Sequence, residues 1–102
     1  MAEHVITVHE LKKCINDENV MLIDVRTPQE REMFHIGGTL IPLQDLPSQI
    51  ASLDKDKTII LYCHTGARSM MAVELFLKEG FNAVKSLAGG IVAWQAEELS
   101  TA

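Results

Sequence analysis

Two short runs of almost uninterrupted apolar residues most constrain how this chain can fold. Residues 20–25 read Val-Met-Leu-Ile-Asp-Val, and residues 58–62 read Thr-Ile-Ile-Leu-Tyr. Runs of this length and composition are typical of strands that are buried on both faces, which occur mainly in parallel sheets covered by helices. We therefore expect both runs to be strands, and residues 20–25 to form a central one.

Helix start signals lie between these strands. Thr7 and Thr27 each lie three residues ahead of a glutamate, Glu10 or Glu30. This spacing is typical of a capping box, and Pro28 suits the first position of the second helix. With apolar periodicity and the positions of glycine and proline, the sequence predicts strands at residues 5–6, 39–41 and 83–87 and helices at residues 7–17, 27–34, 46–53, 69–79 and 91–99.

The order of these elements predicts the fold class. Strands alternate with helices, and the connections are too long for hairpins. The expected architecture is therefore α/β, with three layers (α/β/α) and a mostly parallel sheet of about five strands. In the helix at residues 69–79 we expect Met71, Leu75 and Phe76 to share the buried face, and we expect Trp94 to pack inward.

Length and composition limit the classes of protein that this chain can be. Its 102 residues, 47% apolar and 23% charged, are expected to form one soluble domain over residues 1–102. No segment has the roughly 20 apolar residues of a membrane span, and the N-terminus does not resemble a signal peptide, so we expect a cytoplasmic protein without a membrane partner. The net charge of −5 and the scattered Lys and Arg argue against a nucleic-acid partner. Cys14 and Cys63 are too few for a disulfide framework, or for a zinc site without histidines. The sequence has no Cys-x-x-Cys or His-x-x-x-His spacing, so no metal is expected.

Cys63 lies in the loop that carries most of the functional information. It follows the strand at residues 58–62 and begins a segment, Cys-His-Thr-Gly-Ala-Arg-Ser, that leads directly into a helix. Gly66 allows the positive φ that turns successive amides toward one point, and Arg68 adds a cation. Amides at a helix N-terminus and a nearby guanidinium both favour a thiolate. A free cysteine at a strand end is often a packing residue, but the neighbours of Cys63 favour a reactive sulfur. Cys14 lies in the first predicted helix, away from any such loop, and we expect it to be a packing residue.

A charged pair is predicted at the same edge of the sheet. Asp24 and Arg26 lie at the end of one strand, and Cys63 lies at the end of another. The carboxyl ends of strands in open parallel sheets form the crevice in which ligands bind. The favoured interpretation of Asp24 and Arg26 is a buried ion pair that organises the loops around this crevice.

Four segments, taken in order, resemble the single-domain rhodanese-like sulfurtransferases. They are residues 23–30, 35–43, 63–69 and 87–94, and the resemblance covers nearly the whole chain. It implies that Cys63 takes a sulfane sulfur from a donor as a persulfide and passes it to a nucleophilic acceptor, without a metal or an organic cofactor. It also implies a sulfur-binding loop and a supporting cleft, formed respectively by His64, Thr65, Gly66, Ala67, Arg68 and Ser69, and by Asp24, Arg26 and His35.

The length of the loop distinguishes this chain from related enzymes. Four residues separate Cys63 from Arg68, as in the sulfurtransferases, whereas the related dual-specificity phosphatases resemble Cys-x5-Arg. His64 and Arg68 also depart from the Cys-Gly-Ser/Thr-Gly loop of mercaptopyruvate-using relatives. The expected donor is thus thiosulfate or a persulfide, and the expected acceptor is a thiol, a protein or a cyanide-type nucleophile. The chain departs from the family pattern at two places. Phe34 stands where a glycine is common, and the segment between Gly38 and Pro42 is one residue shorter than usual.

Other functions stay open on the sequence alone. The domain could instead be a non-enzymatic sulfur carrier or interaction module that a partner protein loads, or Cys63 could be a redox-sensing thiol. His64 is equally interpretable as a proton carrier or as a solvent-facing loop residue, and His35 is more often structural than catalytic in such a segment. A monomer is expected. The physiological donor, the acceptor and the pathway are not determined by the sequence.

Overall fold

Parallel strands dominate the computed structural model, which describes residues 2–101. Five strands form one sheet in the order β1-β5-β4-β2-β3, and every neighbouring pair is parallel, which confirms the predicted α/β class. The strands are β1 (Val5–Ile6), β2 (Val20–Asp24), β3 (Thr39–Leu40), β4 (Thr58–Tyr62) and β5 (Val84–Leu87), and the helices are α1 (Val8–Cys14), α2 (Pro28–Met33), α3 (Leu46–Gln49), α4 (Ala67–Lys78) and α5 (Gly90–Thr101).

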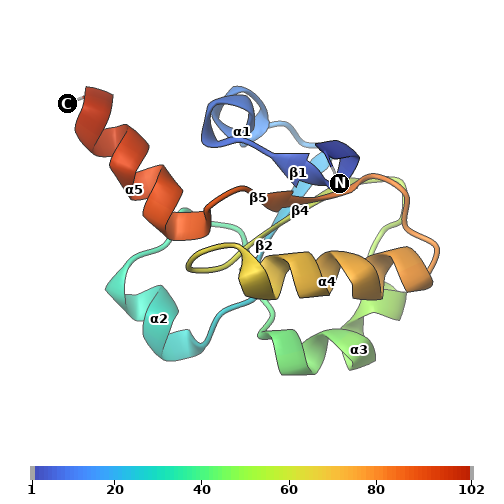
Figure 1. The fold of residues 1–102 in the computed structure, drawn as a ribbon. Helices are drawn as coiled ribbons and strands as arrows, with labels where there is room; N and C mark the ends of the chain where they lie inside the picture. Colours follow the sequence, from blue (N-terminus) through green and yellow to red (C-terminus); the bar gives the residue numbers. More distant parts are fainter. Residues whose placement is uncertain (1, 102) are drawn as a thin grey trace.

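Helices cover both faces of the sheet, so the fold has three layers (Figure 1). Successive residues of β4 point to opposite faces: Ile59 and Leu61 belong to one buried cluster, and Ile60 belongs to the other. The first cluster includes Phe76 of α4, and the second includes Leu11 of α1. This alternation explains why the predicted strands are apolar at nearly every position, since neither face meets water.

The two predicted capping boxes are both present. The amide of Glu10 donates to the Thr7 hydroxyl oxygen at 3.1 Å, and the amide of Thr7 donates to the Glu10 carboxylate at 2.9 Å. The same reciprocal bonds join Thr27 and Glu30 at the start of α2. Local sequence therefore determines where α1 and α2 begin.

Two predicted helices differ from the structure. The helix predicted at residues 46–53 consists of a short α3 followed by a 3₁₀ turn, Ile50–Ser52. The expectation that Met71 lies on the buried face of α4 is wrong, because its side chain is 60% exposed. The buried face is instead formed by residues at spacings of three and four, namely Ser69, Ala72, Val73 and Phe76.

The strand order places a crevice between the ends of β2 and β4. The strand that follows β2 in the sequence, β3, lies at the edge of the sheet beside β2. The strand that follows β4, β5, lies on the opposite side, toward β1. Ligands of open α/β sheets bind outside the carboxyl ends of strands at such a reversal. Asp24, the last residue of β2, pairs with Tyr62, the last residue of β4. Arg26 and Cys63 come just after these two strand ends, so both lie at this crevice.

Candidate active site

The sulfur of Cys63 accepts hydrogen bonds from the loop that follows it. The Gly66 amide lies 3.1 Å from Sγ, and the Ser69 amide lies 3.4 Å from it. Gly66 has φ of 110°, a left-handed conformation that lets the loop turn back on the sulfur before α4 begins. The side chain of Cys63 is only 1% exposed. The loop therefore folds as an amide-lined cradle around a buried sulfur, at the N-terminus of a helix that favours negative charge.

Two buried serines lie behind this sulfur. The Cys63 thiol donates to Ser69 Oγ at 3.6 Å, and Ser69 Oγ is 2.6 Å from Ser86 Oγ on β5. The Ser69 hydroxyl also lies 3.1 Å from the Gly66 carbonyl oxygen, to which it can donate. Ser69 belongs to the predicted sulfur-binding loop, whereas Ser86 was not among the predicted site residues. Ser86 could have been noticed because it places a hydroxyl group in a buried strand, and a buried hydroxyl requires a hydrogen-bond partner.

The start of α5 is bonded to the same loop. The amide of Ile91 donates to the Cys63 carbonyl oxygen at 2.9 Å, and the amide of Val92 donates to the His64 carbonyl oxygen at 3.1 Å. A Cβ added at Gly90 would lie 2.5 Å from each of these oxygens, so only glycine permits the approach. The sequence predicted a helix at residues 91–99, but no local pattern indicated that its start would contact the Cys63 loop.

Asp24 and Arg26 form the expected buried ion pair. Arg26 Nε and Nη2 each lie 2.9 Å from one oxygen of the Asp24 carboxylate, and both side chains are buried. Hydrogen bonding to Asp24 raises the pKa of Arg26 above its usual value, although burial acts in the opposite direction. Arg26 Nη2 also donates to the Phe34 carbonyl oxygen at 2.7 Å, so the pair holds the segment after α2 in place.

Arg68 forms an ion pair with Glu30 that was not predicted from the sequence. Its two terminal nitrogens donate to the two carboxylate oxygens of Glu30, each at 2.7 Å. These bonds are the main reason that the pKa of Glu30 falls to about 2, and they raise the pKa of Arg68. The sequence had explained Glu30 completely as a helix cap, so nothing in the pattern indicated that it also binds a residue 38 positions away.

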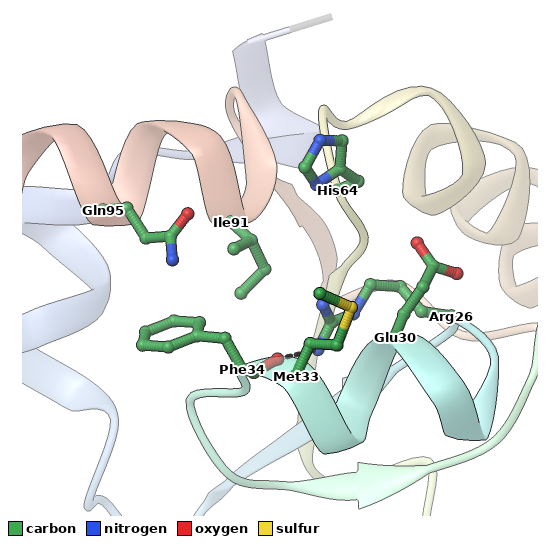
Figure 2. A pocket seen from close by; sticks show the side chains of 7 residues that line it. All are labelled: Arg26, Glu30, Met33, Phe34, His64, Ile91 and Gln95. Carbon is green, nitrogen blue, oxygen red and sulfur yellow. Dashed lines mark hydrogen bonds between the residues drawn. The ribbon is translucent and has the colours of Figure 1, made fainter.

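A pocket of about 330 Å³ opens beside the loop, between α2 and α5. Figure 2 shows Met33 and Phe34 on one side, Ile91 and Gln95 on the other, and His64 above them. Met33 is 88% exposed, an unusual environment for a long apolar side chain. We call this space the His64 pocket; it is lined by Arg26, Glu30, Met33, Phe34, His64, Ile91 and Gln95.

The remaining predicted site residues lie in different places. Thr65 and Ala67 are exposed on the Cys63 loop. Four backbone amides of this loop donate to no acceptor within the described part of the chain; they belong to His64, Thr65, Ala67 and Arg68. His35 does not join the others in the His64 pocket. Its ring is exposed, accepts a bond from the Gly37 amide at 3.0 Å and lines a separate pocket with Arg31 and Glu32.

Metal-binding clusters and membrane-spanning helices are both absent between residues 2 and 101. No group of three or more His, Cys, Asp or Glu side chains there could hold a metal ion. None of the helices there combines the length and the apolar character needed to cross a membrane.

Comparison with known proteins defines the class to which this fold and site belong. Residues 7–97 match the Rhodanese-like domain family, and the chain is a member of that family. A protein named "Sulfurtransferase" from Allochromatium vinosum is 34% identical over 84 residues, 81% of this chain and 78% of that protein. "Probable adenylyltransferase/sulfurtransferase MoeZ" of Mycobacterium tuberculosis is 43% identical over 93 residues, 87% of this chain but only 24% of that longer protein. The crystal structure of a rhodanese-like domain protein from Staphylococcus aureus has a TM-score of 0.80 and 34% identity, covering 89% of this chain and 90% of that one.

Proposed function

We propose that this protein is a sulfurtransferase that carries a sulfane sulfur on Cys63 as a persulfide. The observation that carries the proposal is the cradle around Cys63 Sγ, where the Gly66 and Ser69 amides already point at the sulfur. Donors that are in place before the reaction stabilise developing negative charge without reorganisation. Membership of the rhodanese-like family and the sulfurtransferase names of relatives support the same activity.

The reaction consists of two nucleophilic displacements. The Cys63 thiolate attacks the outer sulfur of the donor, a new S–S bond forms, and the donor leaves with the electron pair of its broken bond. Sulfite leaves from thiosulfate, and a thiolate leaves from a persulfide. An acceptor nucleophile then attacks the outer sulfur of the Cys63 persulfide, and the Cys63 thiolate is regenerated.

Several loop residues have roles in this proposal. Amides from His64 to Ser69 receive the charge of the transferred sulfur, since four of them have no acceptor within the described chain. Thr65 is available to an anionic donor, whereas Arg68 is held in an ion pair by Glu30. His64, exposed at the pocket, is a candidate proton carrier. Because only four residues separate Cys63 from Arg68, the loop suits sulfur better than the larger phosphate of a phosphatase.

Replacement of the nucleophile tests this function directly. We expect Cys63→Ser to lose sulfur transfer from thiosulfate or a persulfide to a thiol or cyanide, because an alcohol is a poor nucleophile at this position. Cys14→Ser is the matched control, since Cys14 packs at the edge of a core cluster in α1. Undiminished transfer by Cys63→Ser in a steady-state assay would refute the proposal.

A second candidate is a sulfur carrier that a partner protein loads. A Bacillus subtilis relative named "Putative sulfur carrier protein YrkF", 34% identical over 84 residues, supports this candidate. Loading of Cys63 by a persulfide-bearing protein but not by small donors would favour this role. A third candidate is a redox-sensing thiol, which predicts ready sulfenic acid or disulfide formation at Cys63 under mild peroxide; no such reaction would dismiss it.

A further inference from the structure

The positive charges nearest the His64 pocket are already bound to carboxylates. Among the residues that line the pocket, Arg26 is the one with a permanent positive charge, and it is bidentate on Asp24. Arg68 of the Cys63 loop is bidentate on Glu30, which itself lines the pocket. Glu30 is ionised at neutral pH, because its pKa is about 2. A dianion such as thiosulfate therefore approaches a site whose guanidinium groups are neutralised and which presents a carboxylate.

The walls of the same pocket suit an apolar group. Met33 and Phe34 face Ile91 across it, as Figure 2 shows, and Met33 is almost fully exposed. Covering these side chains with a carbon substituent removes apolar surface from water, which is favourable. Thiosulfate has no such substituent, whereas an organic persulfide carries one next to its sulfur atoms.

We propose that Glu30 is a specificity-determining residue, which by holding Arg68 makes the site select organic persulfides with apolar substituents over thiosulfate. The inference rests on the proposed function of Cys63 and specifies its donor class. In the loading step the Cys63 thiolate attacks the outer sulfur of R–S–SH. The bond between the two donor sulfurs breaks, R–S⁻ leaves with the electron pair, and Cys63 holds –S–SH; no oxidant or reductant is needed.

Glu30→Gln tests the role of the carboxylate. Glutamine can still accept the Thr27 amide in the capping box, but it removes the negative charge and releases Arg68 from a bidentate ion pair. We expect kcat/KM for thiosulfate to rise on the order of tenfold, as expected when one charge that repels a dianion is removed. Glu32→Gln is the matched control, because Glu32 lies on the same helix but lines the separate pocket with His35. It should leave the ratio of kcat/KM for thiosulfate to that for benzyl persulfide unchanged.

A second variant tests the apolar wall without disturbing the fold. Met33 is exposed at the end of α2, so Met33→Gln should fold normally. We expect it to lower kcat/KM for benzyl persulfide by roughly tenfold and to have a smaller effect on 2-sulfonatoethyl persulfide, whose substituent is charged.

The outcomes separate this inference from the proposed function. Loading of Cys63 by none of the three donors would refute the function itself. Loading that favours thiosulfate in the natural protein, or a donor ratio that stays the same in Glu30→Gln and in Met33→Gln, would overturn the inference and leave the function standing. A preference for benzyl persulfide that shifts toward thiosulfate in Glu30→Gln supports it.

Discussion

At the scale of single residues, Glu30 illustrates how one carboxylate serves the fold and the site together. Its Oε1 atom accepts the Thr27 amide at 3.1 Å and Arg68 Nη1 at 2.7 Å, and its Oε2 atom accepts Arg68 Nη2. The capping bond was predictable from a four-residue pattern, because helix caps are local. The bond to Arg68 depends on how α2 and the Cys63 loop pack, which no local pattern describes.

The lowered pKa of Glu30 predicts a pH dependence of stability. A carboxylate whose pKa falls from its ordinary 4.5 to about 2 on folding stabilises the folded state fully above pH 4.5, and this stabilisation is lost as pH falls through 2. The difference in free energy of unfolding between the natural protein and Glu30→Gln should therefore be constant above pH 4.5 and shrink below it. Urea unfolding at a series of pH values measures this difference. In an Arg68→Met background the shrinkage should be mostly absent, and a full effect there would contradict the account.

Ser86 gives a second prediction for a single residue. Ser86→Ala removes the 2.6 Å partner of Ser69 from a buried environment, so the free energy of unfolding should fall by about 1 kcal/mol. Chemical denaturation checks this value. Ser48→Ala, at an exposed hydroxyl that bonds only to the Asp45 carbonyl, is the control and should change stability by less. Equal effects of the two substitutions would argue against the buried serine pair.

At the scale of secondary-structure elements, the contact between α5 and the Cys63 loop determines where the loop lies. The first amides of α5 bond to the carbonyls of Cys63 and His64, and Gly90 makes the close approach possible. The helix therefore holds the loop through two loop carbonyl groups, whereas the Gly66 and Ser69 amides of the same loop hold the sulfur.

Gly90→Ala should displace this contact. The new Cβ would lie 2.5 Å from two backbone oxygens, and φ at Gly90 is 57°, so the variant combines a steric clash with backbone strain. We expect slower sulfur loading of Cys63 and a loss of roughly 2 kcal/mol in stability. Gly37→Ala is a matched control, since Gly37 also has positive φ but nothing lies within 4 Å of the added Cβ. A smaller loss in Gly90→Ala than in Gly37→Ala would contradict the clash.

Some of these elements were predictable from sequence and others were not. Uninterrupted apolar runs predicted β2 and β4, and capping boxes predicted the starts of α1 and α2, because each signal is contained in a few adjacent residues. The buried face of α4 was misjudged at Met71, because several rotations of a helix rich in apolar residues satisfy its sequence and the neighbouring sheet selects one.

At the scale of the whole molecule, the strand order places the residues of the candidate site at one edge of the sheet. The chain leaves β2 and β4 in opposite directions, so Arg26 and the Cys63 loop meet at one crevice. The alternation of strands with helices was sufficient to predict that Asp24, Arg26 and Cys63 lie at the same edge of the sheet. Two side-chain pairs at the site, Glu30 with Arg68 and Ser69 with Ser86, join segments that are distant in sequence and became visible only in the folded structure.

The central claim, that Cys63 carries transferable sulfur, is tested most directly by mass spectrometry after exposure to benzyl persulfide or thiosulfate. We expect the intact protein to gain the mass of one sulfur atom, peptide mapping to place it on Cys63, and a thiol acceptor to remove it. The same gain should occur in Cys14→Ser and be absent in Cys63→Ser. A gain located on another residue, or an undiminished gain in Cys63→Ser, would contradict the account.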